Sequence, residues 1–306
     1  MIEVEGLTKT YGEKVAVQDL SFVARTGRVT GLLGPNGAGK STTMRMILGL
    51  HRATSGSALV DGRAFVDSPA PMTAVGAMLD AHAVHPGRTA RNYLDALAAT
   101  HHLPARRVDE VLELTGMTEP SRRRVGTFSL GMVQRLGIAA ALLGSPHTLV
   151  LDEPVNGLDP DGVHWVRELV RSLAAAGTTV LLSSHLMSEM AQTADDVVVL
   201  GRGRLVAAGA IADVVAAATA SSVRVRLATE SPAEPLTAAV TAAGGTTSAT
   251  GDALVVTGLD SEQIGHLAAR TGSVLAELTP QSASLEDAFF ELTKDSIEYT
   301  TGGTTS

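Results

Sequence analysis

A glycine-rich segment, GPNGAGKS, occupies residues 34–41. It follows VTGLL, an apolar stretch typical of a strand, and precedes TTMRMILGL, which is compatible with a helix. Glycines at three positions let the backbone curl until its N–H groups point at phosphate oxygens, and the start of the helix adds partial positive charge. Lys40 would reach the β- and γ-phosphates, and the Ser41 hydroxyl would bind Mg²⁺. The pattern predicts a nucleoside triphosphate site, and a plain glycine-rich turn is the weaker alternative.

Two acidic residues end the apolar stretch LVLDEP, residues 149–154. The tip of such a strand is expected beside the phosphate loop, where Asp152 would hold Mg²⁺ directly or through water. Glu153 is the next residue, so its side chain points in a different direction from that of Asp152, and it is expected to orient or deprotonate the attacking water. An acid pair after a strand is weak evidence alone, but together with the phosphate loop it indicates hydrolysis of the nucleotide.

Further segments resemble the ATP-binding cassette of ABC transporters. SLGMVQR (129–135) resembles the signature segment of that family, and NGLDP (156–160) resembles its D-loop. His185 follows the apolar stretch TTVLLSS, as the switch histidine of the family does, and Tyr11 stands where the family stacks an aromatic ring on adenine. The resemblance covers roughly residues 2–215. The ending SLEDAFFELT and the small domain before it resemble the ATPase subunits of drug and antibiotic exporters.

This resemblance implies a set of site residues. Glu153, His185 and Lys40 are the expected catalytic residues, and His185 would contact the γ-phosphate. The expected metal ligands for Mg²⁺ are Ser41, Asp152 and Asp80. The residues expected to bind ATP are Tyr11, Gly34, Pro35, Asn36, Gly37, Ala38, Gly39, Lys40, Ser41 and Thr42.

The resemblance also implies a head-to-tail dimer that forms when ATP binds. Each ATP would lie between the phosphate loop of one copy and the signature of the other, namely Ser129, Leu130, Gly131 and Met132. Ser129 is expected to cap a helix whose N-terminus faces the γ-phosphate. Asp159 of the D-loop would communicate across the interface. A separate integral membrane permease is the second expected partner.

Three positions depart from the family pattern. Asp80 stands where the family usually has Gln, and a solvated loop acid is as plausible as a ligand. Leu130 stands where the family usually has Gly. Leucine is harmless there if the position is helical, but it is strained if the position needs a positive φ. Met132 replaces a usual Gln and loses a side-chain hydrogen bond. Each departure can slow or uncouple hydrolysis, but the catalytic set is complete, so we expect an active enzyme.

Several of these residues have plain structural alternatives. Tyr11 can be an ordinary packing residue, and His185 alone would more often be structural. Four histidines at 82, 85, 101 and 102 invite a zinc site, but no nearby set completes it. The basic run 122–124 is expected to be a solvated face.

The pattern of apolar runs predicts an α/β fold, a parallel-sheet core with antiparallel strands at the N-terminus. With the resemblance, this is a P-loop NTPase of the ABC type over residues 1–215, with a helical subdomain at about 86–145. A linker at 216–222 leads to an α+β domain at 223–295, whose βαββαβ order suggests a ferredoxin-like module, and then to a mobile tail at 296–306.

Composition narrows the function further. The 306 residues are 44% hydrophobic, which excludes disorder for most of the chain, and the net charge of −8 with few aromatic residues argues against nucleic acid as a partner. Cysteine is absent, which excludes disulfides and a thiol nucleophile. No apolar run reaches the roughly 18 residues that span a bilayer. We expect a cytoplasmic protein held at the membrane face by the permease.

The leading hypothesis is therefore the ATP-hydrolysing subunit of an exporter for a drug-like or antibiotic-like compound. The alternatives are a soluble ABC-type ATPase without a membrane partner and an ATP-binding regulatory module with little turnover.

Overall fold

The computed structural model describes residues 1–218, 222–228, 231–281, 285–286 and 288–289. They form two compact units, which meet along the chain between Ile211 and Ala212. The predicted linker 216–222 overlaps the end of helix α8 (Ile211–Ala218) and the first residue of strand β10 (Ser222–Leu227). The predicted tail 296–306 lies outside the described residues.

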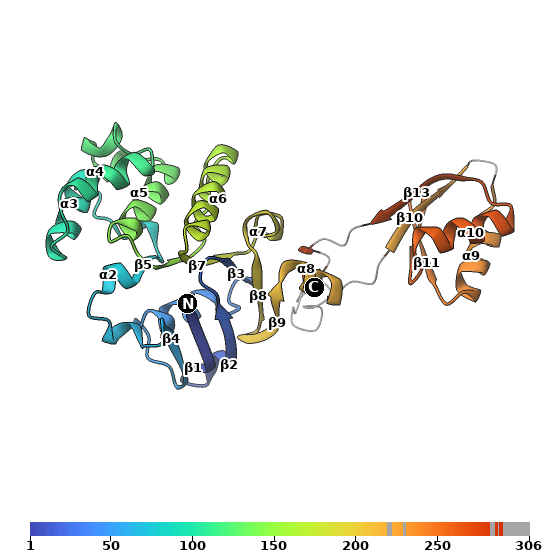
Figure 1. The fold of residues 1–306 in the computed structure, drawn as a ribbon, viewed down its shortest axis with the longest axis horizontal. Coiled ribbons are helices and arrows are strands. Elements are labelled where there is room, and N and C mark those ends of the chain that lie inside the picture. Colours follow the sequence, from blue (N-terminus) through green and yellow to red (C-terminus); the bar gives the residue numbers. More distant parts are fainter. Residues whose placement is uncertain (219–221, 229–230, 282–284, 287, 290–306) are drawn as a thin grey trace, which may run out of the picture. The chain divides into compact units, whose positions relative to one another are not determined.

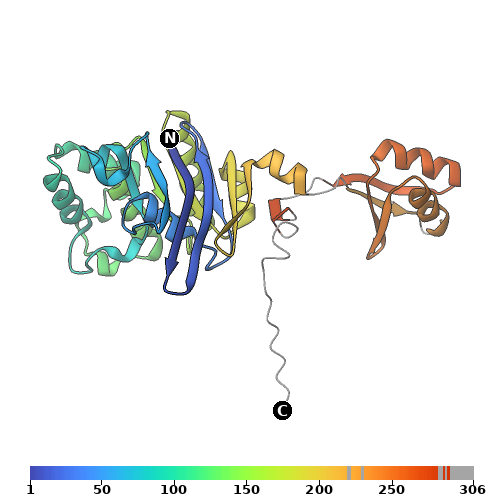
Figure 2. The ribbon, with the colours of Figure 1, turned by 90° about the horizontal axis from the view of Figure 1, so that it is seen from below.

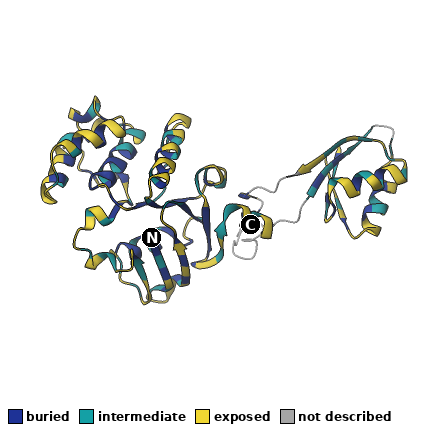
Figure 3. Cartoon of the chain, in the orientation of Figure 1, coloured by how far each residue is buried: buried dark blue, intermediate teal, exposed yellow. Residues whose placement is uncertain are grey.

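A six-stranded sheet forms the centre of the first unit, in the order β5-β6-β7-β3-β8-β9. Its strands pair in parallel except for β9, which is antiparallel to β8. The inner strands are buried along their whole length, as expected for parallel strands covered on both faces (Figure 3). The strands are β3 (Val29–Leu33), β5 (Val75–Met78), β6 (Thr148–Leu151), β7 (Thr179–Ser184), β8 (Asp196–Gly201) and β9 (Arg204–Ala210).

A second, antiparallel sheet has the order β2-β1-β4. Its strands are β1 (Ile2–Tyr11), β2 (Lys14–Ala24) and β4 (Ser55–Val60), and β1 and β2 run side by side as a hairpin (Figure 1 and Figure 2). Helix α1 (Lys40–Ile47) contributes Met44 and Ile47 to one apolar core with this sheet and with the central sheet. The helix that follows the phosphate loop therefore packs against both sheets.

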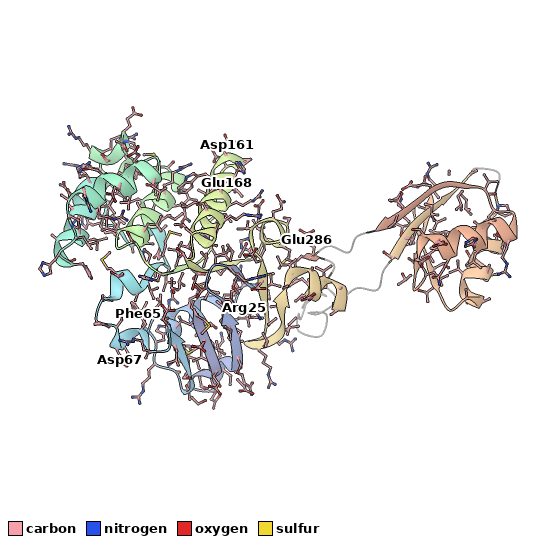
Figure 4. All side chains as sticks on the ribbon, viewed as in Figure 1. Arg25, Phe65, Asp67, Asp161, Glu168 and Glu286 are labelled. Carbon is pink, nitrogen blue, oxygen red and sulfur yellow. The ribbon has the colours of Figure 1, made fainter. Side chains whose placement is uncertain are left out.

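The remaining helices of the first unit lie mainly beyond the central sheet, on the side away from β1 and β2 (Figure 1). Thr89 caps α3, because its hydroxyl accepts a hydrogen bond from the Asn92 N–H. A short 3₁₀ turn, η1 (Phe65–Asp67), follows β4, and both of its end residues are labelled in Figure 4. The helices are α2 (Pro71–Ala74), α3 (Ala90–Thr100), α4 (Arg106–Leu114), α5 (Leu130–Leu142), α6 (Pro160–Ala175) and α7 (Met187–Thr193).

The second unit has its own sheet and core. Four antiparallel strands have the order β11-β12-β10-β13, and Val225, Leu236 and Ile264 lie in the core between the sheet and two helices. Asp260 and Gln263 form a capping box at the start of α10, which the sequence analysis missed. The other elements are α9 (Glu234–Ala242), β11 (Thr246–Thr250), β12 (Ala253–Thr257), α10 (Ser261–Thr271) and β13 (Leu275–Gln281).

Two sequence features concern the chain beyond these elements. The segment SLEDAFFELT, residues 284–293, falls partly outside the described residues, and within it Leu285 and Phe289 are buried. Among the residues that the structure describes, no helix has both the length and the apolar character needed to cross a membrane.

Candidate functional site

The phosphate loop joins β3 to α1 in a tight curl. Gly39 has a φ of +103°, and a Cβ at this position would lie 2.8 Å from the carbonyl oxygen of Ala16. Gly37 also has a positive φ, of +82°. Only glycine adopts this conformation without strain at such a close approach to neighbouring backbone. The glycine spacing predicted from the sequence is therefore required by the backbone itself.

The side chain of Lys40, the first residue of α1, reaches back to this loop. Its Nζ donates hydrogen bonds to the carbonyl oxygens of Gly34 and Pro35, at 2.7 and 3.3 Å, and lies 3.6 Å from Glu153 Oε1. The side chain is nearly fully buried. Phosphate oxygens of a bound nucleotide could therefore replace the two carbonyl oxygens as acceptors of the ammonium N–H groups.

The loop forms one wall of a cavity of about 560 Å³. Most of the predicted ATP-binding residues line it, while Gly34 lies beneath the loop, where a Cβ would meet the Leu200 carbonyl oxygen. Four lining residues were missed by the sequence analysis, namely Lys14, Val15, Ala16 and Arg202. They come from β2 and from the turn between β8 and β9, and no local motif marks them. The lining residues are Tyr11, Lys14, Val15, Ala16, Pro35, Asn36, Gly37, Ala38, Gly39, Lys40, Ser41, Thr42, Glu153 and Arg202.

The two acids that follow β6 are joined by a serine on the neighbouring strand. Ser183 Oγ donates a hydrogen bond to Asp152 Oδ1, at 2.5 Å, and accepts one from the Glu153 N–H, at 2.9 Å. Glu153 has a φ of +50°, which residues with a side chain rarely adopt. Sequence reasoning missed Ser183, although the parallel register of Leu151 with Leu182 brings it opposite Asp152.

His185 contacts Glu153 directly. Its Nδ1 lies 2.8 Å from Glu153 Oε2, while Lys40 faces the other carboxylate oxygen. A carboxylate accepts hydrogen bonds only, so the Nδ1 of His185 is the donor. The structure therefore brings together the three residues predicted to be catalytic.

Tyr11 ends β1 and lines the same cavity. Its side chain is 45% exposed, and its hydroxyl lies 2.7 Å from His51 Nδ1. A ring that is exposed on a cavity wall can stack on a flat ligand. A ring packed in the core would have no free face for such a ligand.

None of the signature residues is among the described residues that line the nucleotide cavity. Ser129 is the N-cap of α5, as predicted, with its Oγ accepting a hydrogen bond from the Met132 N–H at 3.3 Å. Leu130 is the first residue of α5 and is not at positive φ, so the substitution for Gly causes no backbone strain. It is 39% exposed. This helix start is open to an approaching partner.

Asp159 has a structural role that the sequence analysis did not foresee. It is the N-cap of α6, and its Oδ1 accepts a hydrogen bond from the Gly162 N–H at 2.9 Å. Asp161 adds a second acid to the first turn of the same helix (Figure 4). Negative charge at this end stabilises the helix dipole.

Asp80 does not line the cavity that holds Ser41. It follows β5 and lines a separate cavity of about 300 Å³, together with Leu50, Val84 and Tyr93. Burial raises the pKa of the Tyr93 hydroxyl further above neutral pH. The cavity wall is mostly apolar, with helical residues from α3 and α5.

The described residues contain no cluster of three or more histidine, aspartate or glutamate side chains that could hold a metal. His85 instead accepts a hydrogen bond from the Gly87 N–H, and His101 Nδ1 lies 3.0 Å from the Thr100 hydroxyl. The side chain of His82 lies outside what the structure describes. Arg122, Arg123 and Arg124 are all exposed, as expected of a solvated face.

Comparison with known proteins covers both units. A family model described as ABC transporter matches residues 17–156, and a domain of unknown function matches residues 221–286. The bacitracin transport ATP-binding protein of Bacillus licheniformis is 41% identical over 67% of this chain and 68% of its own. The lantibiotic transport ATP-binding protein of Streptococcus pyogenes is 34% identical over 67% of this chain and 89% of its own. A solved ATP-binding subunit of an ABC transporter has a TM-score of 0.64 at 29% identity, covering 70% and 91% of the two chains.

Proposed function

We propose that this chain, which belongs to the family of ABC transporter ATP-binding subunits, uses ATP hydrolysis to power export of a drug-like or antibiotic-like compound. The observation that carries the proposal is the contact of Lys40 and His185 with the two carboxylate oxygens of Glu153, on the wall of the nucleotide cavity. The bacitracin and lantibiotic relatives support a transported compound of this kind. They also favour a transporter over an ATPase without a membrane partner and over a regulatory module.

The geometry supports a direct hydrolytic step. Backbone N–H groups of the loop and Lys40 hold the β- and γ-phosphates. Glu153 removes a proton from a water molecule, whose oxygen bonds to the γ-phosphorus while the bond to the β–γ bridging oxygen breaks. ADP and phosphate are released. Nδ1 of His185 donates to Glu153, and its Nε2 would donate to a γ-phosphate oxygen only when it carries a proton as well. Tyr11 stacks on the adenine.

The donor set suits Mg²⁺. Ser41 and Asp152 offer a hydroxyl and a carboxylate, which are oxygen ligands, and Asp152 is oriented by Ser183. A magnesium ion typically takes one or two such protein ligands and completes its shell with phosphate oxygens and water. Bound there, Mg²⁺ would neutralise charge on the phosphates. For Asp80, which lines the other cavity, the metal role stays a prediction, to be tested by the Mg²⁺ dependence of Asp80→Asn.

A second copy of the chain completes the site. The start of α5 carries the partial positive charge of the helix dipole and an N-cap at Ser129, and Leu130 beside it is exposed. Because these residues do not line the cavity of their own chain, we propose that they meet the γ-phosphate held by another copy. One phosphate loop and one signature per chain then require two chains for two complete sites.

The permease is proposed to dock on the cavity beside Asp80 and on the adjoining helical region. Its apolar wall, with Leu50 and Val84, offers a surface for an apolar segment of a partner, and Tyr93 provides a neutral polar group. Docking there would hold the chain at the cytoplasmic face of the membrane. Nucleic acid is not an expected partner.

The domain organisation follows the same proposal. Residues 1–215 form the cassette, and the α+β domain occupies 223–295. The strand order β11-β12-β10-β13 with helices after the first and third strands of the unit supports a ferredoxin-like module.

Glu153→Gln tests the function. Removing the general base should lower phosphate release at least about a hundredfold, while ATP binding persists and the protein accumulates as a dimer in size-exclusion chromatography with light scattering. Glu168→Gln makes the same chemical change at an exposed position of α6 and should leave turnover unchanged (Figure 4). Unchanged ATP hydrolysis by Glu153→Gln would show that Glu153 is not the general base. Co-purification of a polytopic protein from membranes would identify the permease.

A further inference from the structure

Tyr11 is held by contacts on two sides of its ring. Its hydroxyl lies 2.7 Å from His51 Nδ1, and the two rings meet edge to face, with centroids 6.0 Å apart and an interplanar angle of 80°. Lys9 Nζ lies over one face of the Tyr11 ring, 4.9 Å from its centroid. A ring with one face covered by a cation presents its other face to a stacking ligand.

His51, which contacts the Tyr11 hydroxyl, belongs to a short segment, residues 51–54. His51 N–H donates to the Arg45 carbonyl oxygen at 3.2 Å, which ties the segment to the last turn of α1. Lys9 Nζ donates to the Arg52 carbonyl oxygen at 2.7 Å. Thr54 donates its N–H to the Thr8 carbonyl oxygen and accepts from the Thr10 N–H. The segment is therefore bonded to β1 on one side and to α1 on the other.

These bonds connect two parts of the nucleotide cavity through the protein. The first residues of α1 line the phosphate part of the cavity, and Tyr11 lines the part that we propose binds the base. His51 follows the last turn of α1, and its side chain reaches the Tyr11 hydroxyl. The hydrogen bonds of His51 to α1 and to Tyr11 therefore help to fix the distance between the phosphate loop and the Tyr11 ring. A side chain held in one rotamer loses less entropy when a ligand stacks on it.

We infer that His51 is a positioning residue, which fixes the Tyr11 ring for the base of the bound nucleotide. The inference rests on the stacking role proposed for Tyr11, and it adds a residue that contacts no part of the nucleotide itself. Loss of the His51 contact frees the ring without disturbing the phosphate loop. The effect must therefore depend on the base and be absent for the phosphates alone.

The test compares ATP with inorganic tripolyphosphate, a probe that has phosphates and no base. His51→Phe keeps an aromatic edge and removes the hydrogen bond, and Tyr11→Phe removes the same bond from the other side. Each should raise the KM for ATP about threefold to tenfold, and in His51→Phe the kcat and the inhibition constant of tripolyphosphate should stay within about twofold of wild type. The double variant should be no worse than either single one. His51→Gln, which retains a hydrogen-bonding group, should restore most of the affinity.

An unchanged KM for ATP in His51→Phe would overturn the inference. So would additive effects of the two Phe substitutions, or a parallel loss of tripolyphosphate inhibition. Failure of the proposed function looks different: wild type would release no phosphate from ATP. Failure of stacking alone would be seen as an unchanged KM in Tyr11→Ala.

Discussion

The side chain of Leu130 occupies the space beside the Cα of Gly157. A Cβ at Gly157 would lie 2.1 Å from Leu130 Cδ2, and the φ of Gly157 is +72°. The first residue of α5 therefore rests on the segment that follows Glu153 in the chain. Within one subunit, this contact ties the signature, which we propose meets the nucleotide of the partner, to the acid that we propose activates water.

Gly157→Ala should break this relationship. The substitution forces a side chain into a left-handed conformation, at a cost of about 1–2 kcal/mol, and pushes Leu130 away from its place. We expect turnover to fall about tenfold or more, because the proposed catalytic groups are displaced, while ATP still binds. Phosphate release and ATP binding measured on the same preparation test this.

A matched control separates the two effects of that change. Gly177 also has a positive φ, of +99°, but a Cβ there meets nothing within 4 Å. Gly177→Ala should lower the free energy of unfolding without changing turnover. Adding Leu130→Ala to Gly157→Ala should recover part of the lost activity, and a double variant as impaired as the single one would contradict the steric explanation.

Ser183→Ala should impair the metal site and the general base together. The hydroxyl of Ser183 bonds to both Asp152 and the backbone of Glu153, and residues that orient ligands in this way typically contribute tenfold to a hundredfold. We expect a higher Mg²⁺ requirement and lower phosphate release. Ser184→Ala is the control, since that hydroxyl accepts a hydrogen bond from the Leu186 N–H instead. Equal Mg²⁺ titration curves for Ser183→Ala and wild type would exclude this role.

Asp159 needs two substitutions to separate its cap from its proposed role at the dimer interface. Asp159→Ala removes the N-cap of α6 and should lower the free energy of unfolding by about 0.5–2 kcal/mol in urea titrations. Asp159→Ser keeps a capping oxygen and should preserve stability. If Asp159 also acts across the interface, the Ser variant will dimerise less with ATP in a Glu153→Gln background. If the Asp159→Ser variant dimerises normally, the N-cap of α6 is the only role left for Asp159.

Arg135 links three helices of the cassette. Its guanidinium lies 4.0 Å from the centroid of the Trp165 ring, and its Nη1 donates to the Thr115 carbonyl oxygen at 3.0 Å. Arg135→Met should lower the free energy of unfolding by about 1–2 kcal/mol and change the fluorescence of Trp165, the only tryptophan in the chain. Arg106→Met, at an exposed position of α4, should alter neither. A wild-type emission spectrum in Arg135→Met would contradict the stacking contact.

The features found from sequence depend on residues close together in the chain. The glycines at 34, 37 and 39 permit the backbone curl of the phosphate loop, and the hydroxyl of Ser129 bonds to the N–H of Met132, three residues later. Apolar periodicity predicts the elements because strand and helix have fixed repeats. These are local effects, so the order of the elements and the loop that binds phosphate followed from sequence alone.

The contacts that complete the site join residues far apart in the chain. Ser183 meets Asp152 because two parallel strands take one register, and Lys14 and Arg202 reach the cavity from different elements. The contact of His51 with Tyr11 likewise needs the N-terminal sheet and α1 to be packed together. No spacing in the sequence encodes such distances, because they arise only when the whole core packs. The sequence determined which chemical groups are present, and tertiary packing decided which of them lie within reach of one another.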